Sequence, residues 1–280
     1  DIPWYIMTSP ENDDATRSFF LDNNCFGLPR GNIFLFPQGL MPSLDAATGR
    51  MLLAERGRVA MNPNGHGGTF PALQDSGALE DMVRRGIEHI SYFQVDNPLA
   101  RIMDPLFVGL HVEGDGTSGN MTSKMVRKCS PEEKVGVFCR HNEQTMVLEY
   151  TDLPEDRARE TDEEGRLIFG AGSMALHMIG VDFVHRLVAG EEACPLPWHC
   201  ARKVVAHVDP GNGTRVMPDE PNAMKFETFV FDALPMAGGS LILEALREEE
   251  FGPIKNDSGT DSPESSRRCQ VERAARWLES

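Results

Sequence analysis

The chain has 280 residues, an apolar content of 40% and a formal net charge of −16 at pH 7. This length allows one large domain or two smaller ones with a buried core, and the acidic excess argues against a nucleic-acid-binding surface, which would be basic. The sequence has no run of 18 apolar residues and no apolar leader, so it predicts neither a membrane span nor a secretion signal.

None of the six cysteines belongs to a Cys-x-x-Cys pair. Cys194 and Cys200 flank His199, but a zinc site usually has tighter or repeated spacing of its ligands. We therefore expect six reduced thiols and a cytoplasmic protein. Acidic residues are concentrated in 152–164 and 244–264, where a solvated surface is the simplest explanation.

The first part of the chain predicts alternating strands and helices. Apolar residues 4–7 and 33–36 favour two strands, and residues 12–23 between them favour a helix. Gln38 follows the second of these strands. Residues 51–54 predict a short strand of a hairpin.

Three glycines in four residues form a loop at Gly65-His66-Gly67-Gly68. Glycine lets a backbone approach a ligand closely, and a helix beginning at 69–72 would direct its free N–H groups toward that ligand. Residues 89–95, after the helix stop Gly86, predict a parallel strand. Asp96 would then lie at the carboxyl end of a sheet, where ligands bind and where a carboxylate can hold Mg²⁺. A tight turn and a helix cap are the alternative interpretations of these residues.

The second half of the chain predicts further strands at 121–128, 135–140, 144–150, 167–169 and 240–246. Small residues at 170–173 indicate a backbone close to a ligand, and His177 follows at helical spacing. An amphipathic helix is expected over 181–189. Residues 257–266 are polar and predict disorder, and residues 267–280 predict a helix.

Several segments, in a fixed order, carry a resemblance to a known family. They are Met61-Asn62-Pro63-Asn64-Gly65-His66-Gly67-Gly68, Gly77-Ala78-Leu79-Glu80-Asp81-Met82, Val95-Asp96-Asn97-Pro98-Leu99, Asp104-Pro105 and residues 221–232. Together they closely resemble the UDP-N-acetylglucosamine pyrophosphorylase family of UTP:sugar-1-phosphate uridylyltransferases. The resemblance extends from about residue 5 to about residue 256.

The resemblance implies an α/β fold with a mixed, mainly parallel open sheet flanked by helices. That is the GT-A-like, Rossmann-like architecture of nucleotide-diphospho-sugar transferases. Residues 1–256 would form a partial nucleotidyltransferase catalytic domain. Residues 257–280 would form a disordered linker and a truncated helix that lead to a missing C-terminal region, so the chain is expected to be truncated at both ends.

The resemblance also implies roles for particular residues. Asp96 and Lys255 carry over as catalytic residues, with Asp96 as a ligand of Mg²⁺ and Lys255 as a phosphate contact. The nucleotide-binding positions are Gln38, Gly65 and His66, and the sugar-binding positions are Asn97, Gly136, Glu149, Ser173, Phe229 and Phe231. His66 replaces the Asn of the animal enzymes, and Ser173 replaces an Asn that is usual in the family, so the preferred sugar stays open.

The implied activity is a uridylyl transfer from UTP to a sugar-1-phosphate, which yields a UDP-sugar and pyrophosphate. N-acetylglucosamine-1-phosphate is the expected sugar phosphate. UTP and the sugar phosphate are the expected partners, with neither nucleic acid nor membrane, and the oligomeric state stays open. The alternatives are a glucose-1-phosphate or broad-specificity enzyme and a non-catalytic UDP-sugar-binding protein. The family's Gly-rich loop ending in Thr-Arg-Leu-Gly does not occur in these residues, so we expect little or no turnover by this chain alone.

Overall fold

The computed structural model describes residues 2–190 and 194–279. Its contacts divide the chain into two compact units. The first unit comprises Asp1–Gly86 and Val184–Asp232, and the second comprises Ile87–Phe183 and Ala233–Ser280. Residues 257–280 therefore belong to the second unit, whereas the assignment of 1–256 as a catalytic domain stays a prediction.

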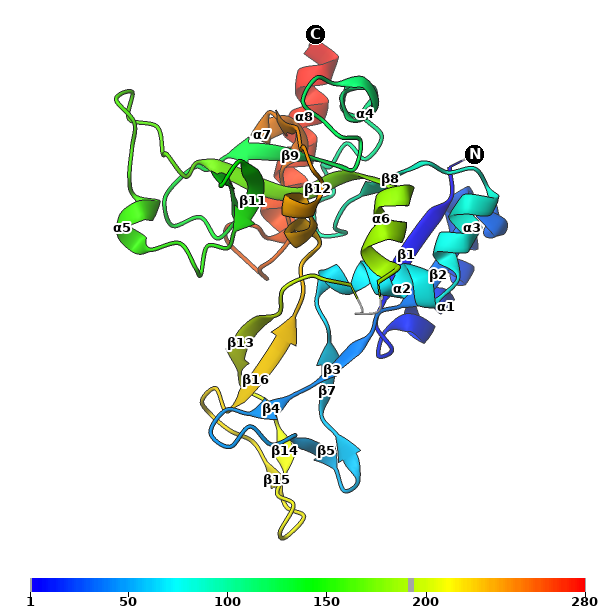
Figure 1. Cartoon of the computed structure of the whole chain (residues 1–280), viewed down its shortest axis with the longest axis vertical. Helices are drawn as coiled ribbons and strands as arrows, with labels where there is room; N and C mark the ends of the chain where they lie inside the picture. The colour runs from blue at the N-terminus through cyan, green and yellow to red at the C-terminus, as the bar shows by residue number, and fades with distance from the viewer. Residues whose placement is uncertain (1, 191–193, 280) are drawn as a thin grey trace. The chain divides into compact units, whose positions relative to one another are not determined.

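The first unit begins with two parallel strands and three helices that lie near them (Figure 1). These elements are β1 (Trp4–Thr8), α1 (Asp13–Asp22), β2 (Ile33–Pro37), α2 (Thr69–Asp75) and α3 (Ala78–Arg84). The strands pair from Trp4 opposite Ile33 to Thr8 opposite Pro37. Asp81 of α3 is buried and accepts a hydrogen bond of 2.7 Å from the Tyr5 hydroxyl, which ties this helix to β1.

Short antiparallel strands form the rest of the first unit. One sheet has the order β13-β16-β4, a second has the order β15-β14-β5-β6, and β3 pairs with β7. Their bounds are β3 (Leu40–Pro42), β4 (Leu44–Asp45), β5 (Leu53–Glu55), β6 (Arg58–Val59), β7 (Met61–Pro63), β13 (His199–Lys203), β14 (His207–Val208), β15 (Arg215–Val216) and β16 (Ala223–Glu227).

The second unit is built on a six-stranded sheet in the order β11-β10-β12-β9-β17, with β8 paired to β12. Its strands are β8 (His89–Tyr92), β9 (Met121–Arg127), β10 (Val137–His141), β11 (Gln144–Leu148), β12 (Ala171–Gly180) and β17 (Ile242–Glu244). Its helices are α4 (Pro105–Glu113), α5 (Glu155–Ala158), α7 (Arg247–Glu250) and α8 (Pro263–Glu279), and α6 (Val181–Val188) begins where β12 ends. Among the described helices, none is long and apolar enough to cross a bilayer.

The expectation of a mainly parallel sheet is wrong. Among the described strand pairs, only β1 with β2 and β9 with β17 run parallel. Short connections explain the antiparallel direction of the hairpin pairs β5 with β6, β10 with β11 and β14 with β15, since parallel neighbours need a long crossover. The turn between β10 and β11, for example, is the pair Asn142 and Glu143, both with positive φ, as a two-residue hairpin turn requires.

Three further expectations need correction. The strand expected at 89–95 ends at Tyr92 and runs antiparallel to β12, so Asp96 does not lie at the end of a parallel strand. The strand expected at 167–169 does not form, since Leu167 makes only an isolated bridge with Thr161 and a turn follows. Strand β12 begins two residues later, at Ala171, and His177 lies inside it rather than in a helix. The expected disorder of 257–266 does not hold either, because α8 begins at Pro263 and Ser266 is buried.

The sequence did identify the elements of the first part of the chain. β1, α1 and β2 are confirmed to within a residue or two, and α2 follows the glycine loop as expected. All six cysteines are free.

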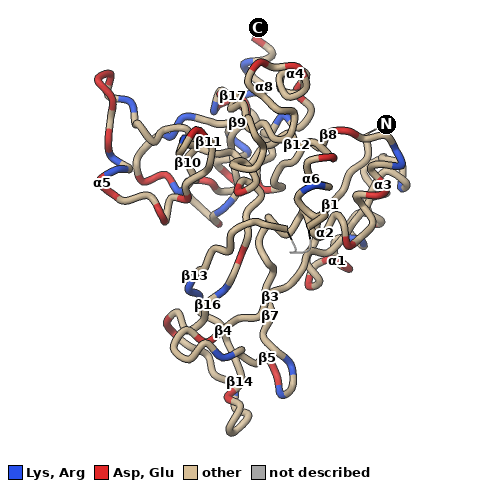
Figure 2. Tube along the Cα trace, in the orientation of Figure 1, with Lys and Arg blue, Asp and Glu red and all other residues tan. Residues whose placement is uncertain are grey.

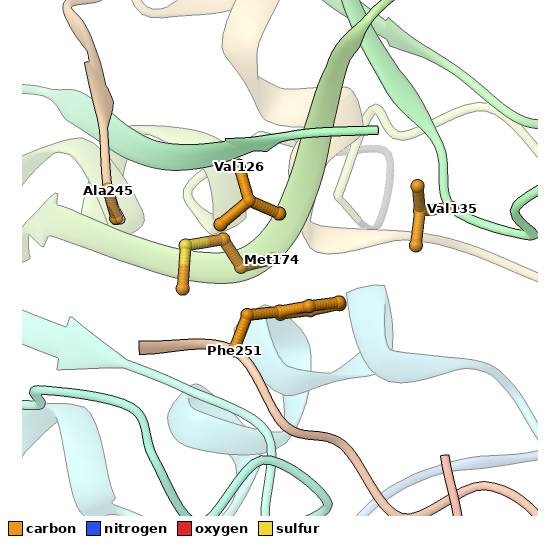
Figure 3. Close-up of a cluster of buried hydrophobic side chains, with 5 residues drawn as sticks. All are labelled: Val126, Val135, Met174, Ala245 and Phe251. Carbon is orange, nitrogen blue, oxygen red and sulfur yellow. The ribbon is translucent and has the colours of Figure 1, made fainter. Parts of the chain in front are cut away.

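A cluster of buried side chains forms part of the core of the second unit (Figure 3). Val126 comes from β9 and Met174 from β12, while Phe251 follows α7. Figure 3 shows the Phe251 ring beneath these strands, with Val135 and Ala245 completing the cluster. The C-terminal part of the chain is therefore packed against the sheet through this ring.

Replacing Phe251 with Ala should lower the free energy of unfolding by about 3–5 kcal/mol, because the lost ring leaves a cavity that the sheet cannot close. Urea denaturation followed by fluorescence and circular dichroism measures the change. Val95→Ala is the matched control, since Val95 is 96% exposed and its truncation should change stability by less than about 0.5 kcal/mol. Equal losses in both variants would refute the core position of Phe251.

Candidate functional site

The glycine loop of the first unit packs directly against the chain just after β16. The Gly67 N–H donates to the Thr228 carbonyl at 2.7 Å, and the Thr228 N–H donates to the Asn64 carbonyl at 2.9 Å. A Cβ at Gly65, where φ is +84°, would collide with the Thr228 carbonyl oxygen. One at Gly67 would lie 2.6 Å from Thr228 Oγ1. The glycines are thus required for close contact between two backbone segments of the protein. A contact from Gly65 to uracil stays a prediction.

The loop that carries Gln38 joins the same region. The Gln38 N–H donates to the Thr8 carbonyl at 2.8 Å, and the Asn64 N–H donates to the Gly39 carbonyl at 3.2 Å. The structure therefore brings the Gln38 loop and the glycine loop together. Asn64, which the sequence did not single out, has a buried Oδ1 that accepts no hydrogen bond from the described residues.

His66 is built into a cluster of rings. Its imidazole stacks on Phe229 with centroids 5.0 Å apart and meets Phe231 at 5.6 Å. The Val230 N–H donates to His66 Nδ1 at 3.1 Å, so a neutral ring carries its proton on Nε2. Burial, and secondly the charge of His199, lowers the pKa of His66 to about 4. The ring is therefore neutral at pH 7, and only its Nε2–H is left to donate to a ligand.

Two residues missed by the sequence reasoning complete this cluster. His199 lies on β13, and the centroid of its ring is 4.4 Å from that of Phe229. The His199 Nε2 is 2.8 Å from Asp232 Oδ2. Burial raises the pKa of Asp232, although its hydrogen bond to His199 acts in the opposite direction. No local pattern could have revealed this pair, since the pairing of β13 with β16 creates it.

Asp96 and Lys255 lie in adjacent segments of the second unit. The Ile254 N–H donates to the Asp96 carbonyl at 2.8 Å, and Lys255 is exposed next to it. Asn97 is buried with both ends of its amide occupied. Its Nδ2 donates to the Glu250 carbonyl at 2.8 Å and its Oδ1 accepts from the Gly252 N–H at 3.1 Å. Asn97 is thus a structural link here, and its expected contact with sugar stays a prediction.

Gly136, Glu149 and Ser173 also come together in the second unit. The Ser173 N–H donates to the Gly136 carbonyl at 2.8 Å, and a Cβ at Gly136 would lie 3.1 Å from Glu149 Oε1. Ser173 precedes an irregularity in the pairing of β12 with β9, and its Oγ accepts from the Ala175 N–H at 3.3 Å. The same Cβ at Gly136 would lie 2.8 Å from Val147 Cγ1, so a side chain at 136 would require the neighbouring Val147 and Glu149 side chains to shift.

The predicted site residues therefore form one group in the first unit and two in the second. The first-unit group is Gln38, Gly65, His66, Phe229 and Phe231; the second-unit groups are Asp96, Asn97 and Lys255, and Gly136, Glu149 and Ser173. Their convergence on one pocket stays a prediction. Two cavities of about 790 Å³ each open in the second unit, and neither is lined by these residues.

Among the residues that the structure describes, no group of three or more His, Cys, Asp or Glu side chains could hold a metal ion. Asp96 is partly exposed and offers a single carboxylate. That arrangement fits Mg²⁺, which keeps several waters and is often bound by one or two carboxylates together with substrate phosphates. Within residues 2–190 and 194–279, Asp96 would therefore need substrate phosphates and water to complete the coordination of the ion.

Replacing Gly67 with Ala should destabilise the first unit by about 1–3 kcal/mol, because the added methyl group overpacks the contact with Thr228 and Phe229. Chemical denaturation measures the loss. Gly31→Ala is the control, since no atom lies within 4 Å of its added Cβ. A Gly67 variant as stable as the control would show that the glycine loop does not pack closely against Thr228 and Phe229.

His66 should make folding stability depend on pH between about 6.5 and 4. Below its ordinary pKa of 6.5 the unfolded chain takes up a proton that the folded ring, with a pKa of about 4, does not. Stability from this residue is therefore complete above pH 6.5 and is lost as the pH falls toward 4, by an amount on the order of 3 kcal/mol at about 1.4 kcal/mol per pKa unit.

Urea denaturation at several pH values tests this effect. His66→Asn should flatten the decline between pH 6.5 and 4. Some decline should remain because burial, followed by the charge of His89, also lowers the pKa of His111 to about 4. An unchanged decline in the variant would contradict the assignment of His66.

Comparison with known proteins gives consistent results. A sequence model of the family described as UTP–glucose-1-phosphate uridylyltransferase matches residues 1–260. UDP-N-acetylhexosamine pyrophosphorylase-like protein 1 of Xenopus tropicalis is 38% identical over 278 residues, covering 99% of this chain and 53% of the relative. The UDP-N-acetylglucosamine pyrophosphorylase of Saccharomyces cerevisiae is 34% identical, covering 100% of this chain and 58% of the relative. The chain spans about half the length of the curated relatives it matches.

Solved structures agree with the sequence relatives. The UDP-N-acetylglucosamine pyrophosphorylase from Trypanosoma brucei, in complex with inhibitor, matches with a TM-score of 0.82 and 30% identity, over 98% of this chain and 54% of that chain. A UDP-glucose pyrophosphorylase from Leishmania major in complex with UDP-glucose has a TM-score of 0.68 at 18% identity, over 89% of this chain and 52% of that chain, which shows a shared α/β fold. Because the family match covers most of the chain and its relatives are 38% and 34% identical along nearly all of it, the chain belongs to the UDP-N-acetylglucosamine pyrophosphorylase family of uridylyltransferases.

Proposed function

We propose that the protein transfers a uridylyl group from UTP to N-acetylglucosamine-1-phosphate, which yields UDP-N-acetylglucosamine and pyrophosphate. Relatives with this activity in their names match almost the whole chain. The structural observation that supports the proposal most directly is the 2.8 Å hydrogen bond from Ile254 N–H to the Asp96 carbonyl. It joins two distant segments that carry the two residues assigned to the phosphates.

In the proposed reaction, a phosphate oxygen of the sugar phosphate attacks the α-phosphorus of UTP. The new P–O bond forms as the bond from the α-phosphorus to the bridging oxygen breaks in line, and pyrophosphate leaves with that electron pair. Such a reaction needs alignment and charge neutralisation rather than a covalent enzyme intermediate. The Lys255 ammonium would bind phosphate oxygens. Asp96 would contribute one ligand to Mg²⁺, which when bound neutralises charge on the phosphates.

The remaining candidate residues would bind the two ends of the UDP-sugar. The Gln38 amide can pair with the edge of uracil, beside the backbone of Gly65. Glu149 can accept hydrogen bonds from sugar hydroxyls, in a space that Gly136 keeps open. Phe229 and Phe231 supply apolar surface for an N-acetyl group.

A second candidate function is a pyrophosphorylase for glucose-1-phosphate or for several sugars. Ser173 favours it, since a Ser has fewer hydrogen-bonding groups than the usual Asn and would reach a sugar less directly. Isothermal titration of the chain with UDP-N-acetylglucosamine, UDP-glucose and UDP separates the two functions. Tighter binding of UDP-N-acetylglucosamine than of UDP-glucose supports the first, and equal or inverted affinities support the second.

Turnover separates an enzyme from a UDP-sugar-binding protein. Formation of UTP from UDP-N-acetylglucosamine and pyrophosphate would be measured for the 280-residue chain and for a longer product that includes the neighbouring coding sequence. Activity of either product supports a uridylyltransferase. Binding of UDP-sugar without any exchange of pyrophosphate in both would favour the non-catalytic alternative.

Glu149→Gln should weaken binding of the UDP-sugar by about 10- to 100-fold and leave UDP binding unchanged. The substitution removes a charged hydrogen-bond acceptor that contacts the sugar and not the UDP part of the ligand. Titration calorimetry with both ligands measures the difference. Glu143→Gln in the same hairpin is the control, since its side chain is 95% exposed at the turn. Equal weakening of UDP and UDP-sugar by Glu149→Gln would exclude a sugar contact.

A further inference from the structure

Lys124 is a completely buried cation in β9, a strand between β12 and β17. Its Nζ is 2.7 Å from Asp104 Oδ2, and 2.9 and 2.7 Å from the two carboxylate oxygens of Glu250. These acceptors match the three protons of the ammonium. Apolar side chains in such a place are often as stabilising as buried ions, so stability alone does not explain this triad of Lys124, Asp104 and Glu250.

The two carboxylates of the triad fix the ends of two helices. Asp104 precedes α4, and its Oδ1 accepts from the Leu106 N–H at 3.1 Å. Burial alone would raise the pKa of Asp104. The hydrogen bond and charge of Lys124, together with the backbone N–H groups of Leu106 and Phe107, outweigh burial and hold this pKa below its usual range. Glu250 is the last residue of α7 and is buried. Lys124 therefore ties α4 and α7 to the same point of the sheet.

A chain of hydrogen bonds leads from Glu250 to the segments of Asp96 and Lys255. The Glu250 carbonyl accepts from Asn97 Nδ2 at 2.8 Å, and Asn97 Oδ1 accepts from the Gly252 N–H at 3.1 Å. The Ile254 N–H then donates to the Asp96 carbonyl at 2.8 Å. Residues 250–254 are thus joined at alternate positions to Asp96 and Asn97, and Lys255 follows directly.

We propose that the triad is a positioning unit, which orients Glu250 and through it holds the Lys255 segment against the Asp96 loop. This inference rests on the proposed function, which assigns those two residues to the phosphates. An ion triad suits the task because the directions of its hydrogen bonds fix the orientation of Glu250, whereas apolar packing tolerates rotation. Lys124 touches no reacting group, so its role is to position residues that do.

Amide hydrogen exchange tests the proposal without a ligand. Glu250→Gln keeps the size of the side chain and one acceptor for Lys124. It should therefore fold more readily than Lys124→Met, which leaves the buried Glu250 carboxylate and the partly buried Asp104 carboxylate without their cation. In Glu250→Gln, the Gly252 and Ile254 amides should exchange at least about tenfold faster, because the link to Asn97 and Asp96 opens more often. The Ser123 and Ala245 amides, which bond across β9 and β17, should keep their rates.

Asp81→Asn is the matched control. Asp81 is also a buried carboxylate and pairs with Arg84 and Arg85, but it lies in the first unit. This variant should lose stability and leave the exchange of Gly252 and Ile254 unchanged. Unchanged exchange of these amides in Glu250→Gln, or equal acceleration of all four amides, would overturn the proposal.

Ligand binding distinguishes positioning from general destabilisation. Glu250→Gln should weaken binding of UTP about three- to tenfold in the native background and not at all in a Lys255→Ala background, because its effect passes through Lys255. Equal weakening in both backgrounds would overturn the proposal. The exchange result decides the positioning role by itself, whereas the absence of uridylyl transfer in both the 280-residue chain and the longer product refutes the proposed function alone.

Discussion

Hydrogen bonds between distant backbone segments hold the candidate residues of each unit in place. In the first unit the glycine loop bonds to Thr228, and in the second the Asp96 carbonyl accepts from Ile254. Such contacts require two segments of the backbone to approach closely, which explains the glycines at positions 65 and 67. Each unit therefore fixes its own group of candidate residues through its own backbone contacts.

Buried charges reinforce this arrangement at a cost in desolvation. Figure 2 shows acidic and basic residues spread over the whole trace, and most of the ion pairs involve exposed side chains, as in Arg58 with Glu55. Exposed pairs contribute little. Lys124 and Asp81 differ because each is buried and joins elements from separate parts of the sequence. Their geometry is therefore restricted far more than that of a surface pair.

The sequence predicted local elements better than their pairing. β1, α1 and β2 have clear apolar patterns and definite ends, so their positions could be predicted. Whether neighbouring strands run parallel or antiparallel could not be predicted, because the same apolar strand fits either kind of partner. β12 was missed since its small residues, from Ala171 to Ser173, are typical of loops when no neighbouring strand is considered. His199 with Asp232, and Lys124 with Glu250, meet only after the chain has folded.

The two departures from the family pattern differ in their physical consequences. His66 is held by Phe229, by Phe231 and by the Val230 N–H, so the protein itself uses one face and one nitrogen of the ring. Its replacement of Asn therefore acts first on folding and on its pH dependence. Ser173 lies beside Gly136 and Glu149 and is shorter than the usual Asn. Under the proposed function, a difference in sugar preference between this protein and its relatives would therefore arise at Ser173 rather than at His66.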